Sequence, residues 1–295
     1  MKRIQALLIG ITIIFTGLHT AAQEGEPVLA SVIYEFRYVN DTTHRDQPVT
    51  EKMILRLGQN SSRYSSYTLE SNLRKQSNGR WTEMSGGAIK RGGGGGVAIA
   101  FGPGVTEESL FQHIKENKLN KIAAAGGIDY LVEAPLPKID WKITKETRKI
   151  DAYSCQKAVG NYAGRSYTAW FTTDLPFRNG PWKLSGLPGL ILEATDAKNE
   201  VSFLFKEISR DSTSDNTGTT IKKLVPADEK EFDRVYQAYQ TDPIGTRRSQ
   251  MPGATGPIDL ILMDSTGKSS ANENALPIFE KYKKETNNPI ELIKQ

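Results

Sequence analysis

The sequence predicts a mainly β fold: a curved antiparallel sheet or partial barrel, half-barrel-like in shape, with one to three packed helices. Apolar and polar residues alternate with a period of two in many segments, which places one set of side chains on each face of a sheet. These segments are rich in valine, isoleucine, tyrosine, phenylalanine and threonine, which strands favour. The links between them are short, and short links join antiparallel neighbours.

Strands are expected where the alternation is clearest, and two pairs of them are expected to form hairpins. Residues 196–199 and 161–164 are the expected hairpin loops. The charge-mixed run 142–149 is expected to be a solvent-facing strand at a sheet edge. The alternating segments are 32–39, 52–57, 152–160, 165–172, 190–195 and 201–208.

Three helices are expected. Residues 229–240 place Phe232, Val235, Tyr236 and Tyr239 on one apolar stripe with helical spacing. A second helix is predicted over 107–118, with Thr106 as its N-cap and two glutamates in its first turn. A third, less regular pattern predicts a helix over 276–284.

The N-terminus predicts an exported protein. Residues 1–22 combine Lys2 and Arg3, an apolar run and small residues before a cleavage point, which is typical of a signal peptide; an uncleaved anchor is the alternative. We expect residues 23–295 to form a single β-rich domain in the periplasm or at the outer-membrane periphery, with no membrane span after cleavage. Within it, a glycine-rich loop near 85–104 and flexible loops near 211–219 and 243–257 are expected.

Composition excludes several classes of function. The formal charge of +4 falls to +2 when Lys2 and Arg3 are removed, so nothing favours nucleic-acid binding. His44, His113 and Cys155 show no metal-ligand spacing, and no serine-nucleophile motif occurs, so we assign no metal, cofactor or catalytic residue. Cys155 is interpreted as a small buried residue rather than a reactive thiol.

Thirteen aromatic residues fall in the β-rich parts of the sequence. On a curved sheet they line an apolar cleft or form an ordinary core, and the core is the favoured interpretation. They are Tyr34, Phe36, Tyr38, Tyr64, Tyr67, Tyr153, Tyr162, Tyr167, Trp170, Phe171, Trp182, Phe203 and Phe205.

The most informative motif lies at residues 180–194, where three glycines and two prolines precede a strand-like apolar run. Pro188 favours an extended Leu187, and the glycines on either side of this pair permit positive φ or close backbone contact. Leu187 then turns inward, and Trp182 covers the turn. We assign this motif a structural or docking role, carried by Gly180, Pro181, Trp182, Gly186, Leu187, Pro188, Gly189, Leu190 and Ile191.

Several short motifs together resemble the GLPGLI family, also called Porph_ging, a set of exported bacterial proteins of unknown function. The similarity extends over residues 141–208, and the hexapeptide that names the family stands complete at 186–191. The resemblance implies export and carries no assigned activity. The residues that carry it are 155–158, 164–165, 169–171, 180–182 and 186–191.

Three functions are compatible with these patterns. The first is a non-catalytic cell-envelope protein that binds an apolar ligand or an outer-membrane protein, because no catalytic set is recognisable and a non-enzyme is favoured. Its candidate contacts are Trp170, Tyr167, Arg165 and Lys157, the last two interpreted as surface cations. The second is a carboxylate-based hydrolase of envelope polymers, which would use Asp174, Glu193 and Asp196. The third is a structural interaction module.

Overall fold

A computed structural model describes most of the residues that follow position 24. The predicted signal peptide (1–22) and the predicted helix over 276–284 lie outside the described residues, as does part of the glycine-rich segment. The described residues are 25–67, 81–84, 88–91, 97–101, 106, 108–210, 216–219, 221, 223–250, 258–263, 269–271 and 287–292.

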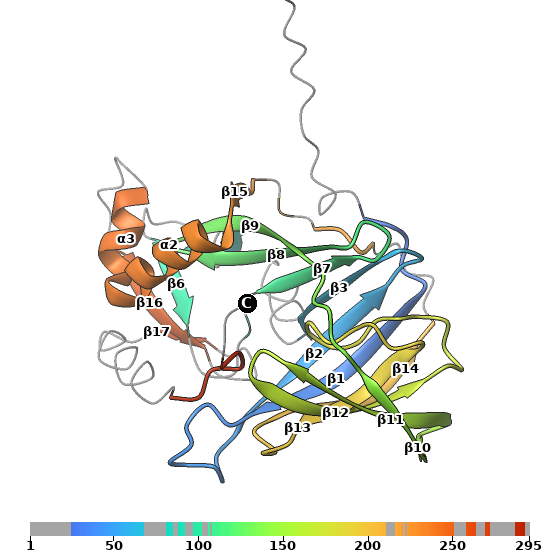
Figure 1. Ribbon diagram of the computed structural model, residues 1–295. Helices are drawn as coiled ribbons and strands as arrows, with labels where there is room; N and C mark the ends of the chain where they lie inside the picture. Colours follow the sequence, from blue (N-terminus) through green and yellow to red (C-terminus); the bar gives the residue numbers. More distant parts are fainter. Residues whose placement is uncertain are drawn as a thin grey trace, which may run out of the picture.

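The fold is mainly β and is built on one open, curved sheet of twelve strands (Figure 1). Neighbouring strands are antiparallel except at one edge, where β15 pairs with β9 in parallel. The sheet order is β10-β11-β12-β13-β14-β1-β2-β3-β7-β8-β9-β15. The strands are β1 (Ala30–Tyr38), β2 (Val49–Leu57), β3 (Ser61–Ser66), β7 (Ser109–His113), β8 (Lys118–Ala125), β9 (Ile128–Pro135), β10 (Lys142–Ile150), β11 (Tyr153–Tyr162), β12 (Arg165–Thr172), β13 (Leu190–Asp196), β14 (Val201–Ser209) and β15 (Val225–Ala227).

A second sheet and two helices complete the described elements. The second sheet has five strands in the order β17-β16-β6-β5-β4, and two of them, β5 and β6, lie in the segment predicted as a glycine-rich loop. Helix α3 occupies the first half of the segment predicted as a loop near 243–257. The bounds are β4 (Trp81–Met84), β5 (Ala88–Arg91), β6 (Val97–Phe101), β16 (Ile258–Met263), β17 (Ser269–Ala271), α2 (Glu229–Thr241) and α3 (Pro243–Gln250).

The predicted hairpins and edge strand are confirmed. β11 and β12 are joined by a tight turn in which Ala163 has φ 48°, and β13 and β14 are joined through residues 197–200. The charged strand β10 lies at one edge of the sheet and is mostly exposed, so lysine and glutamate side chains protect that edge from further pairing. Register shifts in β1 and β12 mark bulges, which increase strand twist and help the sheet to curve.

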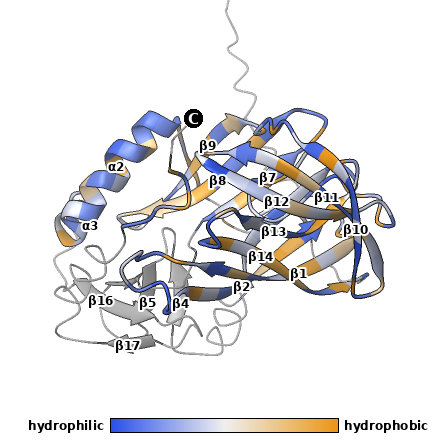
Figure 2. Ribbon diagram, turned by 60° about the horizontal axis from the view of Figure 1, so that its bottom comes forward, coloured by the Kyte–Doolittle hydropathy of each residue, from blue (hydrophilic) through white to orange (hydrophobic). Residues whose placement is uncertain are grey.

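Helix α2 confirms the predicted apolar stripe except at Tyr236, which is exposed. Asp228 caps it, accepting a hydrogen bond from the backbone N–H of Glu231, whose side chain accepts one from the backbone of Asp228 in return. Phe232 and Tyr239 pack against strands β8 and β9. The rest of the helix is largely hydrophilic (Figure 2).

The helix predicted over 107–118 is wrong, because most of this segment forms β7 and the turn into β8. Leu110 and Phe111 are both buried, yet they face opposite sides of the sheet and belong to different apolar clusters. Thr106 caps no helix. Its backbone N–H and hydroxyl both donate to Glu51 Oε2, at 2.9 and 2.7 Å.

The inner face of the sheet carries the main core, since one apolar cluster joins strands from both ends of the sheet order. Most of the aromatic residues are buried there, which confirms the core interpretation. Phe36 stacks on Phe203 with ring centroids 5.1 Å apart, and Trp182 stacks on Phe203 at 6.2 Å. Cys155 is buried, and burial raises the pKa of its thiol to about 11, as expected for an inert packed residue.

Most of the link between β12 and β13, residues 175–189, packs against the inner face of the sheet, and we call this part the plug segment. Leu184 and Leu187 are completely buried in the main core. Polar contacts fix the segment to distant strands: Asn179 Nδ2 donates to Ser62 Oγ at 3.0 Å, and Gln112 Nε2 donates to the Trp182 carbonyl at 3.1 Å.

Two glycines give the plug segment its path. Gly186 has φ +94°, a backbone conformation that residues other than glycine rarely adopt. Gly189 lies against the backbone of Thr172, where an added Cβ would come within 2.0 Å of the carbonyl oxygen. Leu187 between them points into the core, as the sequence predicts, whereas Pro188 is exposed.

Candidate functional site

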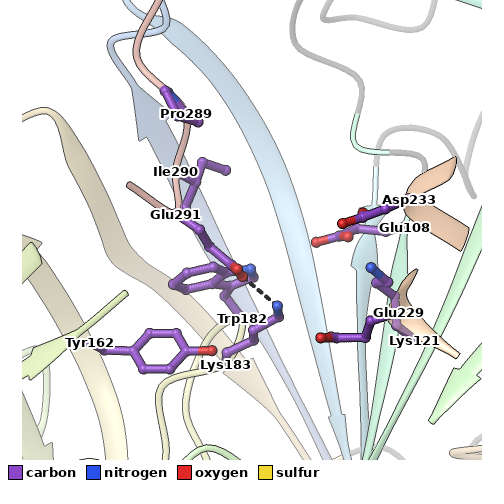
Figure 3. Close-up of a pocket in the computed structure, with 10 residues that line it drawn as sticks. All are labelled: Glu108, Lys121, Tyr162, Trp182, Lys183, Glu229, Asp233, Pro289, Ile290 and Glu291. Atoms are coloured by element: carbon purple, nitrogen blue, oxygen red, sulfur yellow. Dashed lines mark hydrogen bonds and ion pairs between the residues drawn. The ribbon is translucent and has the colours of Figure 1, made fainter. Parts of the chain in front are cut away.

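A cleft of about 280 Å³ opens beside the plug segment and is the candidate functional site (Figure 3). It lies between two groups of side chains, one from the plug segment and the C-terminal end of the protein, the other from β8, α2 and the residue before β7. The lining residues are Glu108, Lys121, Tyr162, Trp182, Lys183, Glu229, Asp233, Pro289, Ile290 and Glu291.

The first wall is fixed by packing. Trp182 has φ 56°, unusual for a bulky residue, and its ring meets the ring of Tyr162 edge-on with centroids 5.5 Å apart. Lys183 follows directly, and its Nζ forms an ion pair with Glu291. Both aromatic rings are almost fully buried, so they support this wall while Lys183, Ile290 and Glu291 face the cleft (Figure 3).

The second wall carries carboxylates. Glu229 and Asp233 lie one helical turn apart on α2 and therefore project from the same face, in the first turns of the helix, where the dipole favours negative charge. Glu108 lies just before β7, close to Asp233 in Figure 3. Lys121, from β8, lies over the ring of Phe232 with Nζ 4.7 Å from the ring centroid.

The electrostatics of the cleft are set by four carboxylates and two ammonium groups. Burial alone would lower the pKa of Lys183, but the nearby Glu108 and Glu291 raise it above the usual value, so the ammonium remains charged. Burial raises the pKa of the Tyr162 hydroxyl to about 12, so this group remains a neutral donor. The cleft thus presents fixed acceptors and donors within a net negative field.

Such an arrangement suits a neutral, polyhydroxylated ligand. Carboxylates accept hydrogen bonds from hydroxyl groups, ammonium groups donate to hydroxyl and carbonyl oxygens, and charge-assisted bonds of this kind are the stronger ones. The same groups meet two needs of hydrolysis: a carboxylate can accept a proton from water, and a charged donor can stabilise a developing oxyanion. No cluster of three metal-ligating side chains occurs among the described residues.

The predicted motif residues are brought together, and one of them reaches the cleft. Trp182 lines it, whereas Leu187, Leu190 and Ile191 are buried in the core. The Tyr34 hydroxyl donates to the Ile191 carbonyl at 2.7 Å, so the end of the motif is also bonded to β1.

The structure divides the four predicted ligand or partner contacts into a partly exposed pair and a buried pair, and none of them lines the cleft. Lys157 and Trp170 lie opposite each other on β11 and β12, where Lys157 pairs with Glu146 and Trp170 stacks under Arg148. Tyr167 is buried in the core. Arg165 is also buried, so its interpretation as a surface cation is wrong.

The three carboxylates considered for a hydrolase do not meet. Asp196 is buried and pairs with Arg165, with Nη1 to Oδ2 at 2.8 Å. Glu193 points to the other face of β13, where it pairs with Arg148. Asp174 accepts a hydrogen bond from the Ser154 backbone at 3.2 Å.

Sequence reasoning missed the carboxylates and lysines of the cleft. Glu229 and Asp233 were visible as an i, i+4 acidic pair beside the predicted apolar stripe of α2. Lys183 adjoins the motif tryptophan. Glu108 was assigned to a helix that does not form, and nothing in the local pattern connects Glu291 with these residues.

Comparison with known proteins adds one family match. A protein-family model described as "N-glycanase peptide, N-terminal domain" matches residues 107–232. This span contains Glu108, Lys121, Trp182, Lys183 and Glu229 of the cleft. No curated protein matches the sequence.

Two solved structures of PNGF-II share the fold. One, in space group P21, has a TM-score of 0.51 and 13% identity, and covers 72% of this protein. The other, in space group C2, has a TM-score of 0.50 and 16% identity over the same share. In both, the match covers 33% of PNGF-II, so this protein spans about a third of the length of the structures it matches.

These findings correct two predictions. The assignment to the GLPGLI family is wrong, because the model that matches is the N-glycanase one, and its span includes the hexapeptide at 186–191. The physical reason is that this hexapeptide encodes a turn and a buried leucine, which describe a backbone path rather than an activity. The prediction of a non-catalytic cell-envelope protein is contradicted by the same matches, which are consistent with an enzyme.

Proposed function

We propose that this protein acts on the N-linked glycans of glycoproteins and that the cleft beside the plug segment binds the glycan. The observation that carries the proposal is that the N-glycanase family match over residues 107–232 includes side chains from both walls of the cleft, whereas Asp233 and residues 289–291 lie outside it. The shared fold with PNGF-II supports it.

The chemistry of the cleft supports a neutral glycan. Its four carboxylates and two ammonium groups match the hydroxyl and acetamide groups of a saccharide, while their net negative charge disfavours acidic sugars. Its volume lies near the lower end of small-ligand sites, which hold roughly 300–1,000 Å³. A short stem next to the asparagine fits this space better than a whole branched glycan.

The same groups provide for cleavage of the bond between glycan and asparagine. In that hydrolysis, water adds to the amide carbonyl carbon, the carbon–nitrogen bond breaks and the glycan leaves as a glycosylamine. Glu108 or Asp233 would accept the water proton and deliver it to the departing nitrogen, and Lys183 would stabilise the carbonyl oxygen. Export through the predicted leader would bring the protein to glycoproteins outside the cytoplasm. Binding of an apolar ligand or of an outer-membrane protein stays a prediction from the sequence.

The test uses a peptide that carries an N-linked chitobiose, with binding measured by calorimetry and release by mass spectrometry. We expect the wild type to bind, and the double variant E108Q/D233N to bind at least about tenfold more weakly, since a charge-assisted hydrogen bond contributes about 1.5–3 kcal/mol. E146Q is the matched control, because Glu146 is exposed and pairs with Lys157 outside the cleft.

Release of the glycan and conversion of asparagine to aspartate would identify the cleft as a catalytic centre. Binding without release would identify a glycan-binding site. The proposal is wrong if the wild type neither binds nor cleaves the glycopeptide, or if E108Q/D233N behaves as E146Q does.

A further inference from the structure

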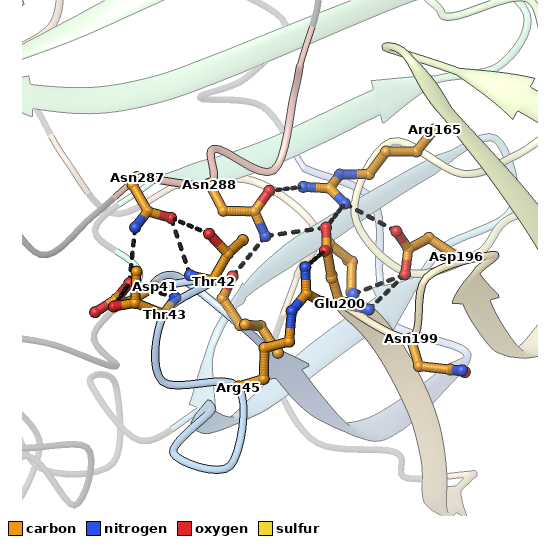
Figure 4. Close-up of polar contacts among 12 residues, drawn as sticks. Asp41, Thr42, Thr43, Arg45, Arg165, Asp196, Asn199, Glu200, Asn287 and Asn288 are labelled. Atoms are coloured by element: carbon orange, nitrogen blue, oxygen red, sulfur yellow. Dashed lines mark hydrogen bonds and ion pairs between the residues drawn. The ribbon is translucent and has the colours of Figure 1, made fainter.

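Residues 289–291 form part of the first wall of the cleft and belong to the segment 287–292, which we call the strap. The strap lies beside the start of β12, where the dark red end of the ribbon is seen in Figure 1. It has no helix or strand of its own. Its position therefore depends on contacts with the rest of the molecule (Figure 4). Asn287 is bonded to Asp41 and Thr42, and the residues that follow are bonded to Arg165 and its neighbours.

Arg165 holds the strap with a fully satisfied guanidinium group. Its Nε donates to the Ile290 carbonyl at 2.8 Å, and Nη2 donates to the Pro289 carbonyl at 2.8 Å and to Asn288 Oδ1 at 2.7 Å.

The remaining donors of Arg165 bond to the hairpin of β13 and β14. Its Nη1 donates to Asp196 at 2.8 Å and to Glu200 at 3.0 Å. All five N–H donors of the arginine are used, three on the strap and two on the sheet.

Asn288 completes the anchor from the strap side. Its Nδ2 donates to the Val39 carbonyl at 2.6 Å and to Glu200 Oε2 at 3.2 Å, and its backbone N–H donates to the Asn40 carbonyl at 3.1 Å. The hydroxyl of Tyr38 donates a hydrogen bond to the Asn288 carbonyl. Arg165, Asn288 and Glu200 are all buried, so the loss of one partner would leave polar groups of the others unpaired in the interior.

The strap runs from this anchor to the cleft. Ile290 packs on the main core, the Leu292 N–H donates to the Ala163 carbonyl at 3.0 Å, and Glu291 pairs with Lys183. Figure 3 shows Ile290 and Glu291 on the first wall, facing the carboxylates of the second. The anchor and the wall are thus successive parts of one short segment.

We propose that Arg165 is a positioning residue that binds the strap and so builds the ligand-binding wall formed by Ile290 and Glu291. It touches no ligand itself. The proposal rests on the proposed function only in taking a neutral N-glycan as the ligand. The anchoring and the pairing of Lys183 are properties of the free protein.

The experiment compares R165M with N288A and with R148M. Met fills the volume of the arginine stem without its donors, and N288A keeps the Arg165 pairs with Asp196 and Glu200. R148M is the matched control, because Arg148 pairs with Glu193 and stacks on Trp170 without touching the strap. Three quantities are measured in each variant: amide hydrogen exchange of the strap, the acylation rate of Lys183, and chitobiose-peptide binding.

In R165M and N288A we expect amide exchange at Asn287, Asn288 and Leu292 to accelerate at least about tenfold, as expected for the loss of buried hydrogen bonds. We expect Lys183 acylation to accelerate by a similar factor, because Glu291 leaves its side, and glycopeptide binding to weaken. Exchange in β11 and β13 stays as in the wild type, which shows that N288A is folded even if R165M is not. R148M matches the wild type in all three.

The proposal is overturned if the strap amides remain protected in N288A and in any folded R165M. It is also overturned if the strap is released while Lys183 acylation and glycopeptide binding stay unchanged. If the wild-type protein binds no glycopeptide, the proposed function fails, while exchange and acylation still decide whether Arg165 positions the strap.

Discussion

The inner face of the curved sheet has a filled end and an open end, and they meet within the plug segment. At the filled end, Leu184 and Leu187 are completely buried and the glycines bring backbones together. At the open end, charged side chains surround a cleft. Trp182 and Lys183 are neighbours in sequence, yet the indole packs into the core and the ammonium points to the cleft. One segment can therefore stabilise the fold and also supply side chains to a site.

The largest expected effect lies at the filled end. Leu187→Ala removes a completely buried side chain and leaves a cavity, which costs about 2–5 kcal/mol of unfolding free energy. Denaturant unfolding measures this loss. Pro188→Ala, one residue on but exposed, is the control and is expected to cost far less. A loss below about 1 kcal/mol for Leu187→Ala would show that this end is not packed as described.

Gly186 and Gly189 extend this contrast, because of these two only Gly189 is in close contact with another backbone. Gly189→Ala forces a methyl group against the Thr172 carbonyl and is expected to cost about 1–3 kcal/mol or more. Gly186→Ala brings the added methyl group no closer than 4.0 Å to the Trp141 ring and carries only the strain of positive φ, about 1–2 kcal/mol. Thermal unfolding of both variants ranks them. A larger loss for Gly186→Ala would contradict this account of the plug segment.

The ion pair of Lys183 with Glu291, between the two ends, is expected to make the unfolding free energy fall at alkaline pH. The pKa of Lys183 is raised in the folded protein, so its contribution to stability is complete below the unfolded value of about 10.4 and disappears as pH rises through the higher folded value. Unfolding free energies measured between about pH 9 and 12 should fall more steeply in the wild type than in Lys183→Met. Parallel curves of unfolding free energy against pH would show that the ion pair of Lys183 with Glu291 does not contribute to stability.

The smallest effect on stability is expected at the open end. E108Q/D233N changes charges at a solvated cleft and is expected to alter the unfolding free energy by no more than about 0.5 kcal/mol for each substitution. Chemical denaturation checks this directly. A loss comparable to that of Leu187→Ala would make these carboxylates part of the folding core and would remove the contrast between the two ends.

Strands were easier to predict than the one helix that failed. Alternation over five or more residues is decisive when both sheet faces differ in polarity, as in β1, β12 and β14. In the segment 107–118, Leu110 and Phe111 are apolar neighbours buried on opposite faces of β7, so a helical stripe and a two-sided strand give the same short pattern. Only pairing with β3 and β8 distinguishes the two.

The site was less predictable than the fold. The predicted motif contains Trp182 and lies next to the candidate cleft, and the backbone of Trp182 has a positive φ. The carboxylates of the second wall come from the residue before β7 and from α2, and Glu291 comes from the far end of the sequence. Their convergence depends on how the sheet curves, and no local pattern records that.

The sequence was enough to predict the inward turn of Leu187, the inert, buried Cys155 and seven strands of the sheet, β1, β2 and β10 to β14, because these depend on side-chain period and backbone preference over a few residues. The strands β3, β7, β8, β9 and β15 were not predicted. The tertiary structure alone decided that Arg165 is a buried anchor and that Glu108, Asp233, Lys183 and Glu291 face one another. Whether a charged side chain is buried or exposed depends on the groups that surround it in space. These groups can come from distant parts of the sequence: Arg165 and Asn288 are bonded to each other but lie more than one hundred residues apart.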